Sequence, residues 1–276
     1  MKLGVILRCF AKTPELVKDQ VIQIHKTVGA LTATRRTGVP ISRIDVVIPI
    51  NPAFIDVDCG KTKNTLGKLP THLVSTVRET RLDIFSGAVN ETAIWQLSRG
   101  CTHTLVLSSS CASLVSEENL EALIEPFEDS ALVAGFVLPD PTLSEFIKRG
   151  CITNTFAIWD LVAFFSVGGM SLAEGNPRVD RSKNRYIQTE DGPIAFAGLE
   201  TTTLYRLGVN FGRCIAPVFP LETGVWETPD PAKDPEGSRR EHLKRKSKTG
   251  RHEACLQMEG YDWREMENFI LPGYPK

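Results

Sequence analysis

Two groups of side chains in this 276-residue chain could take part in transfer chemistry. The first is the serine run from Ser108 to Ser110, at the end of an apolar, strand-like segment that begins at His103. The second is the acidic pair Glu190 and Asp191. Ligands bind at the carboxyl ends of strands in an open α/β sheet, where the serines would offer hydroxyl and N–H donors to a phosphate or ribose. A carboxylate facing the same cleft could act as a general base. Together the two groups predict transfer chemistry.

Both groups also have an ordinary structural interpretation. Glu190 and Asp191 could be acids at a helix start that suit the helix dipole ahead of Pro193. The serines could be a polar strand exit that leads to a helix cap at Ser116. Cys111 would be a nucleophile only beside a base, and the neighbouring sequence supplies none. The sequence leaves both interpretations open.

Further polar and basic residues could bind an anionic donor. Arg8 and Asn51 stand where the first and second predicted strands leave the sheet, although Arg8 could equally form an internal ion pair. Residues 239–251 hold seven Lys or Arg residues against one acid. This basic run, with Arg245 near its middle, could neutralise a diphosphate, or it could be a solvated helix face.

Alternating strand and helix patterns predict the parallel sheet that would position these groups. Strands are expected at residues 4–10, 44–50, 82–87, 104–107, 131–138, 152–159 and 211–218. Helices are expected from Pro14, at residues 91–99 behind an Asn90 cap, after Ser116, and at residues 161–166 and 194–207. Residues 51–73 are expected to form a long loop, Gly168 and Gly169 a corner that is either flexible or at positive φ, and Gly208 is expected just past the end of the last helix.

Composition limits the class of protein. A hydrophobic content of 42% is enough to bury a sizeable core, and a formal charge of −1 gives no global field that would attract nucleic acid. Seven cysteines without Cys-x-x-Cys spacing fit a reducing compartment. The first eight residues read as a core strand rather than a signal peptide, and the apolar stretch 158–170 is shorter than the roughly 20 residues of a membrane span. A cytoplasmic protein without a transmembrane segment or a nucleic-acid partner is expected.

The composition changes after Phe219. Residues 227–238 contain three prolines and four acids, which is typical of a linker, and the basic run follows them. Four aromatic residues lie in the last part of the chain and could pack back on the body: Tyr261, Trp263, Phe269 and Tyr274. We expect one domain over residues 1–220 and a C-terminal tail over residues 221–276 on the same domain.

The order of these elements resembles the GT-A glycosyltransferases, especially family 2, over roughly residues 4–218. Four features carry the resemblance after the strand–helix–strand start: a helix that begins Asn90-Glu-Thr-Ala and closes Arg99-Gly-Cys, the strand Thr104 to Leu107, the corner Val167 to Met170, and Glu190-Asp191. The resemblance implies a GT-A-like, Rossmann-type α/β fold with a mostly parallel central sheet flanked by helices. It also implies a hexosyltransferase-like enzyme that uses a nucleoside-diphosphate sugar and a hydroxyl acceptor.

The resemblance also assigns roles to individual residues. In that family the fourth strand ends in a D-x-D motif that holds a divalent metal against the donor diphosphate, and the aspartate of the Glu–Asp pair is the general base. That base would be Asp191, with Glu190 beside it. Serines replace the D-x-D motif here, and Mg²⁺ and Mn²⁺ prefer carboxylate oxygens. We therefore expect no cofactor and an inverting reaction that is metal-independent or only weakly metal-dependent.

Two sets of binding residues follow from this assignment. The donor would contact Arg8, Asn51, Ser108, Ser109, Ser110 and Arg245. The acceptor region would include Asn154, Trp159, Gly168 and Gly169. The alternative is a catalytically degenerate GT-A-like protein that acts as a binding or assembly module; the missing carboxylates favour it and Asp191 opposes it.

Overall fold

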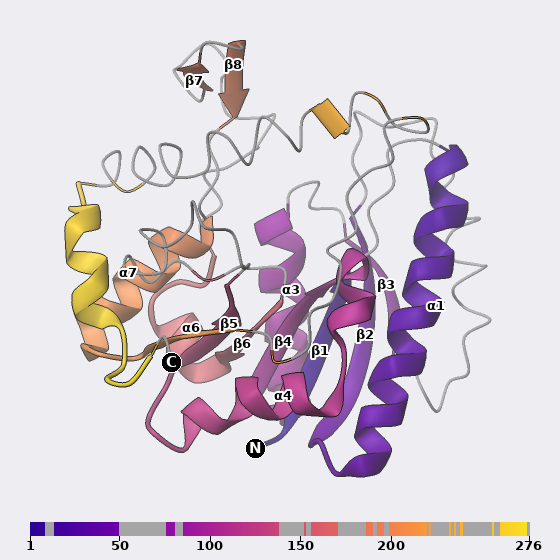
Figure 1. Ribbon diagram of the computed structural model, residues 1–276, viewed down its shortest axis with the longest axis horizontal. Coiled ribbons are helices and arrows are strands. Elements are labelled where there is room, and N and C mark those ends of the chain that lie inside the picture. Colours follow the sequence, from indigo (N-terminus) through magenta and orange to yellow (C-terminus); the bar gives the residue numbers. More distant parts are fainter. Residues whose placement is uncertain are drawn as a thin grey trace.

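The chain folds around a sheet that lies between two layers of helices (Figure 1). The computed structural model describes residues 1–8, 14–49, 76–80, 85–137, 152, 156–170, 186–189, 192–195, 199–219, 221, 232, 235, 238–239, 256 and 260–274. No helix among these residues has the length and hydropathy needed to cross a bilayer.

Seven strands form the main sheet, in the order β3-β2-β1-β4-β6-β5-β9. Their bounds are β1 Leu3–Arg8, β2 Ile41–Pro49, β3 Thr76–Thr80, β4 His103–Ser108, β5 Val133–Phe136, β6 Phe156–Asp160 and β9 Ile215–Val218. β6 runs antiparallel to its neighbours β4 and β5, and the other paired strands are parallel. The expected α/β class with a mostly parallel central sheet flanked by helices is confirmed.

Apolar side chains alternate between the two faces of the central strands, as the pleat of a strand requires. Leu105 and Leu107 of β4 belong to one hydrophobic core, whereas Val106 belongs to the core on the other face. Burial on both faces explains why β1 and β4 read as continuous apolar runs in the sequence. β4 is the central strand of the sheet, as expected.

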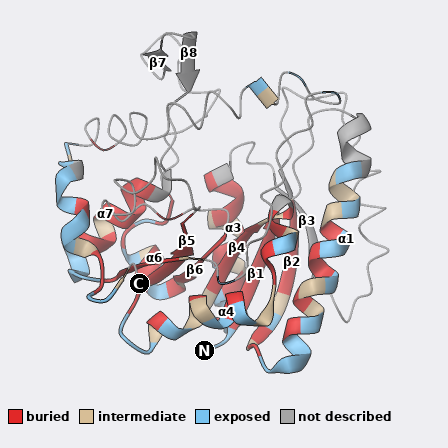
Figure 2. Ribbon diagram, viewed as in Figure 1, coloured by how far each residue is buried: buried red, intermediate tan, exposed pale blue. Residues whose placement is uncertain are grey.

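The helices divide between the two faces. α1 (Pro14–Thr37) and α4 (Glu117–Ile124) pack on one core, and α3 (Phe85–Ser98), α6 (Leu161–Ser166) and α7 (Leu199–Phe211) pack on the other. Figure 2 shows their buried sides turned toward the sheet and their exposed sides toward solvent. Local signals set two of the helix starts: the Ser116 side chain caps α4, and the Asp160 side chain caps α6.

The third strand and the second long helix differ from expectation. The predicted strand at residues 82–87 is wrong, because β3 covers Thr76–Thr80 and α3 already begins at Phe85. A short apolar run fits a buried helix as well as a strand, and here contact with the sheet selects the helix. Asn90 therefore lies inside α3 rather than capping it.

The elements near the carboxyl end of the domain also differ. The predicted helix over residues 194–207 begins too early, since Ile194 lies in β8 (Gly192–Ala195), which pairs antiparallel with β7 (Tyr186–Thr189). Gly208 lies within α7 rather than past its end. The Phe269 ring occupies the space where a Cβ would lie, which explains why this position is a glycine. The final strand is shorter than expected, because Phe211 still belongs to α7.

The C-terminal residues 260–274 return to the domain. The 3₁₀ helix η5 (Trp263–Phe269) packs against α7, and Ile270 forms a parallel bridge with Ile215 at the outer edge of β9. Leu271 N–H donates to the carbonyl of Ile215, and Cys214 N–H donates to the carbonyl of Phe269. The segment therefore pairs with an edge strand that would otherwise offer unpaired backbone groups.

Candidate functional site

The order of the strands reverses between β1 and β4. From β1 the chain continues to β2 and β3 on one side, whereas β4 pairs with the other side of β1. In open α/β sheets the crevice outside the carboxyl ends of the strands at this reversal is where ligands bind. Arg8, the last residue of β1, is in register with Ser108, the last residue of β4. Two of the predicted site residues are therefore neighbours at the expected edge.

The serine run divides into parts with different surroundings. Ser108 is half-buried at the end of β4, and Ser109 opens the 3₁₀ helix η2 (Ser109–Leu114) with 2% of its surface exposed. Ser109 Oγ donates to Gln20 Oε1 at 3.0 Å, so this hydroxyl joins η2 to α1. Ser110 belongs to η2, and its side chain lies outside the described part of the structure. Ser108 is thus the serine whose described position best suits a ligand.

The described residues at this edge suit an anion better than a divalent cation. Arg8 brings a positive charge and Ser108 and Ser109 bring hydroxyls, whereas Mg²⁺ and Mn²⁺ require hard anionic oxygens. Nowhere in the described ranges do three or more His, Cys, Asp or Glu side chains form a group that could hold a metal. A D-x-D-type metal site does not fit these residues.

Five of the predicted site residues lie outside the described ranges: Asn51, Asn154, Glu190, Asp191 and Arg245. β7 ends at Thr189 and β8 begins at Gly192, and these two residues are paired. The helix that Glu190 and Asp191 were expected to open begins only at Leu199. The role of Asp191 as a general base stays a prediction.

The predicted acceptor residues Gly168 and Gly169 form a corner at the end of α6. Their φ angles are 89° and 69°, which confirms the expected left-handed backbone. Trp159 has no exposed surface and its ring lies 5.5 Å from that of Phe164. We therefore place Trp159 in the hydrophobic core rather than in the acceptor region.

Asn90 and Thr203 hold this corner, and sequence reasoning gave neither residue this role. Asn90 Nδ2 donates to the carbonyl of Met170 at 2.9 Å, and Met170 N–H donates to Asn90 Oδ1 at 2.9 Å. Thr203 Oγ1 donates to the carbonyl of Gly169 at 3.0 Å. The only local signal was an asparagine in the interior of a helical stretch, a position that disfavours asparagine unless its amide has a partner.

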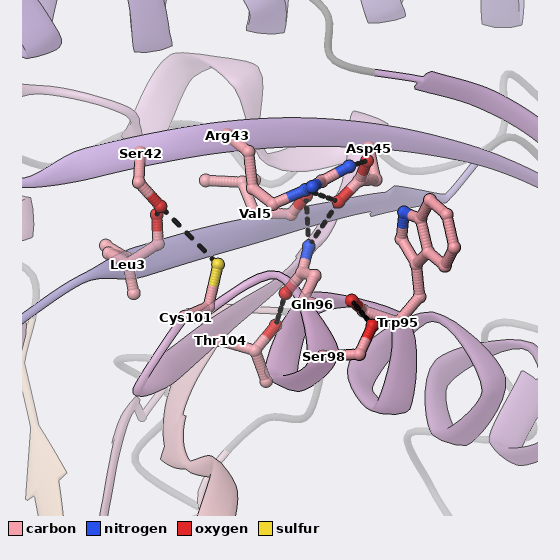
Figure 3. A network of polar contacts seen from close by, with 10 residues as sticks. All are labelled: Leu3, Val5, Ser42, Arg43, Asp45, Trp95, Gln96, Ser98, Cys101 and Thr104. Carbon is pink, nitrogen blue, oxygen red and sulfur yellow. Dashed lines mark hydrogen bonds and ion pairs between the residues drawn. The ribbon is translucent and has the colours of Figure 1, made fainter.

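A buried polar network joins α3 to β1, β2 and β4 (Figure 3). Asp45 has no exposed surface, and its carboxylate accepts hydrogen bonds from Arg43 and, at 2.8 Å, from Gln96 Nε2. The same Gln96 nitrogen donates to the carbonyl of Val5, and Thr104 Oγ1 donates to Gln96 Oε1. The hydrogen bond to Asp45 is the main cause that raises the pKa of Arg43.

This network is structural. Its β1 partner, Val5, lies three residues before Arg8, so the network sits away from the carboxyl edge of the sheet. Each amide or carboxylate in it has a partner, as buried polar groups require. The sequence did contain a signal, since Asp45 is a charged residue between the apolar residues Ile44 and Val46 of a buried strand.

His103 lies at the opposite, amino edge of β4. Its Nε2 is 3.7 Å from Asp160 Oδ2, and its ring packs edge-on against Phe127. Burial lowers the pKa of His103, and Asp160 partly opposes that change. These contacts explain a histidine at this position by packing and pairing within the fold.

Comparison with known proteins gives similarity at the level of structure. No protein family and no curated protein matches the chain by sequence. Among solved structures it is similar to a 4-diphosphocytidyl-2C-methyl-D-erythritol synthase from Anaerococcus prevotii (13% identity, TM-score 0.39, 60% of this chain and 74% of that one). It is also similar to a mannosyltransferase from Pyrobaculum calidifontis in complex with GDP-Man and Mn²⁺ (10% identity, TM-score 0.39, 62% of this chain and 47% of that one).

A third similar structure is the bifunctional IspDF of Campylobacter jejuni, with 12% identity and a TM-score of 0.38 over 60% of this chain and 43% of that one. The chain thus spans less than half the length of the mannosyltransferase and of IspDF. At these identities and TM-scores the comparisons carry no argument about function.

Proposed function

We propose that this protein is a GT-A-like glycosyltransferase that moves a sugar from a nucleoside-diphosphate sugar to a hydroxyl acceptor. The reaction inverts the anomeric carbon and needs no metal ion. We assign the GT-A-like domain to residues 1–220, and residues 221–276 to a tail on the same domain that contributes Arg245 to the donor site.

The observation that carries the proposal is the pairing of Arg8 with Ser108 at the reversal between β1 and β4. A phosphate ligand at this edge meets a guanidinium and a hydroxyl that come from adjacent strands. Arginine binds phosphate in a planar, bidentate manner, which suits it to a diphosphate without a metal. At the end of β4, Ser108 and Ser109 stand where a D-x-D motif would supply carboxylates, and this replacement supports a metal-free site.

The reaction follows from these assignments. Asp191 accepts the proton of the acceptor hydroxyl as its oxygen bonds to the anomeric carbon of the donor. The bond from that carbon to the diphosphate breaks, and the diphosphate leaves with the electron pair. Arg8 and Arg245 stabilise the charge that develops on it. Attack and departure on opposite faces invert the anomeric carbon.

Calorimetric titration with uridine, guanosine and thymidine diphosphate sugars, in Mn²⁺ and then in EDTA, tests the donor site. We expect binding that EDTA does not change. Arg8→Gln should weaken it by about 10- to 100-fold, the loss of a charge-assisted hydrogen bond of about 1.5–3 kcal/mol. Arg213→Gln is the matched control, because Arg213 is an exposed arginine next to the amino end of β9.

Three outcomes would contradict parts of the proposal. Binding that requires Mn²⁺ rejects metal independence and directs the search for carboxylates to Asp56, Asp58 and Asp140. Equal affinity of the Arg8→Gln and parent proteins rejects the site at β1 and β4. Failure to bind any donor rejects the transferase and favours a degenerate binding module.

Removal of the proposed base gives a separate test. Asp191→Asn should lower the rate of sugar transfer, or of donor hydrolysis by water, by about 10²- to 10⁴-fold while donor binding persists. Asp129→Asn, at an exposed aspartate between α4 and β5, is the control and should leave the rate unchanged. A rate for Asp191→Asn within a few-fold of the parent would show that Asp191 is not the base.

A further inference from the structure

Two consecutive serines at the end of β4 serve opposite sides of the sheet. Ile6 and Val106 belong to the core on the α3 side, and Arg8 and Ser108 each follow two residues later. Because side chains alternate along a strand, Arg8 and Ser108 lie on that same face, as neighbours at the ends of β1 and β4. Ser109 instead reaches α1, which packs on the opposite face.

The Ser109 hydroxyl is engaged within the protein. Ser109 has 2% of its surface exposed, and its Oγ donates to Gln20 Oε1 of α1 at 3.0 Å. A serine hydroxyl has a single proton, and a phosphate oxygen can only accept a hydrogen bond from it. While Ser109 donates to Gln20, it therefore offers no proton to a phosphate. Its contribution to this edge comes from what the bond holds in place.

The bond fixes the segment that follows β4. η2 begins at Ser109, directly after the last residue of the strand, so no loop separates the two elements. η2 packs against α1, and Cys111 lies in the same core as Ile24 of that helix. α1 is also the helix that follows β1, the strand that carries Arg8. Ser109 and Gln20 thus join the elements that follow the two strands of the proposed donor edge.

We infer that Ser109 and Gln20 are positioning residues, whose hydrogen bond holds Ser108 beside Arg8 and so sets the affinity for the diphosphate of the donor. This inference rests on the proposed function. It gives the adjacent serines different tasks, because Ser108 contacts the ligand and Ser109 orients Ser108 from the other face. Gln20 then belongs to the donor site without contacting the donor.

A double-mutant cycle separates this role from direct binding by Ser109 and from a purely structural bond. Ser109→Ala removes the hydroxyl, and Gln20→Met removes the acceptor at a similar side-chain length. The single and double variants are titrated calorimetrically, in Mn²⁺ and in EDTA, with the nucleoside-diphosphate sugar that the parent binds most tightly and with the corresponding free nucleoside diphosphate. Urea unfolding measures the free energy of unfolding of each variant.

Two control variants remove similar groups at helix ends that lead into the amino ends of β4 and β9. Ser98→Ala deletes a hydroxyl that donates to the carbonyl of Trp95 within α3. Asn210→Ala deletes an amide that donates to the carbonyl of Arg206 within α7. Both controls should bind the two ligands with the affinity of the parent.

We expect Ser109→Ala and Gln20→Met each to weaken binding of both ligands by about 3- to 10-fold, the range that one neutral hydrogen bond contributes. The double variant should lose no more affinity than either single variant, because both substitutions break the same bond. The loss should be equal for the nucleotide sugar and the free nucleoside diphosphate, since Arg8 and Ser108 are assigned to the diphosphate.

Three results would overturn the positioning role. A loss of affinity in Ser109→Ala but not in Gln20→Met would show that Ser109 binds the ligand directly. Losses that add in the double variant would show that the two side chains act independently. Donor affinity within twofold of the parent, together with coupling in the free energy of unfolding, would make the bond purely structural.

These results leave the proposed function intact as long as the parent binds a donor and Arg8→Gln binds it more weakly. If the parent binds none of the nucleoside diphosphates or their sugars, the proposed function fails, and the positioning role falls with it.

Discussion

Single residues show how closely α3 approaches the sheet. Gly4 of β1 lies under the Gln96 side chain, and a Cβ at this position would overlap the Gln96 amide. That amide contacts the carboxylate of Asp45, the carbonyl of Val5 and the hydroxyl of Thr104, so it has no other favourable position. The glycine is needed because a buried polar side chain lies directly on the strand.

We predict that Gly4→Ala lowers the free energy of unfolding by about 1–3 kcal/mol, because the added methyl group overpacks a filled space and displaces Gln96 from Asp45. Urea unfolding measures the change. Gly29→Ala is the control, since no atom lies within 4 Å of a Cβ there and the residue is exposed in α1. It should stabilise the protein by about 0.5–1 kcal/mol, and a similar gain for Gly4→Ala would contradict the packing argument.

At the scale of secondary-structure elements, the C-terminal segment and α7 share an aromatic cluster. Tyr205 of α7 stacks on Tyr261 with ring centroids 4.4 Å apart and meets the Phe269 ring edge-on at 5.4 Å. The Tyr205 hydroxyl is hydrogen-bonded to Glu265, and burial together with this bond raises the pKa of Tyr205 to about 12. Gly208 lets the Phe269 ring reach the backbone of α7.

We predict that Gly208→Ala destabilises the protein by about 1–3 kcal/mol, although alanine favours a helix interior by about 1 kcal/mol. The reason is that the new methyl group and the Phe269 ring cannot occupy the same space. In a Phe269→Ala background the substitution should be neutral or stabilising. A double-mutant cycle by urea unfolding checks this prediction, and additive effects would show that the two positions do not interact.

At the scale of the whole molecule, two cores lie on the two faces of one sheet, and the α3, α6 and α7 core includes Cys214 just before β9. Burial raises the pKa of the Cys214 thiol from 9.0 to about 12. Above pH 9 the unfolded chain releases this proton and the folded chain retains it. The contribution of this buried thiol to the free energy of unfolding is therefore fully present below about pH 9 and is lost as the pH rises toward 12.

We predict that Cys214→Ala removes part of this alkaline loss. Between pH 9 and pH 11 the parent should lose about 1.4 kcal/mol more per pH unit than the variant, because one pKa unit corresponds to that free energy. Urea unfolding at pH 8, 9, 10 and 11 measures both slopes. Cys214→Ser, which also lacks a group that titrates in this range, should follow the alanine variant, and a parent slope equal to both would reject a buried thiol as the cause.

The sequence by itself determined the features that depend on neighbouring residues. Apolar runs marked β1 and β4, Ser116 marked the start of α4, and the Gly168-Gly169 pair marked a corner at positive φ. The alternation of these elements was enough for the α/β class, because each element must bury its apolar face against another. The sequence also placed Arg8 and Ser108 at strand ends, because the apolar runs of β1 and β4 stop at these polar residues.

Only the tertiary structure decided which distant residues meet. Asn90 and Met170 are eighty residues apart, and Gln96 and Asp45 are fifty-one apart, so no local pattern links them. The same holds for Gly208. The sequence predicts that the helix ends there, whereas in the structure Gly208 lies inside α7 and makes room for the Phe269 ring. A glycine or an asparagine within a helix is unfavourable in isolation, and its presence is explained only when packing between elements supplies the partner.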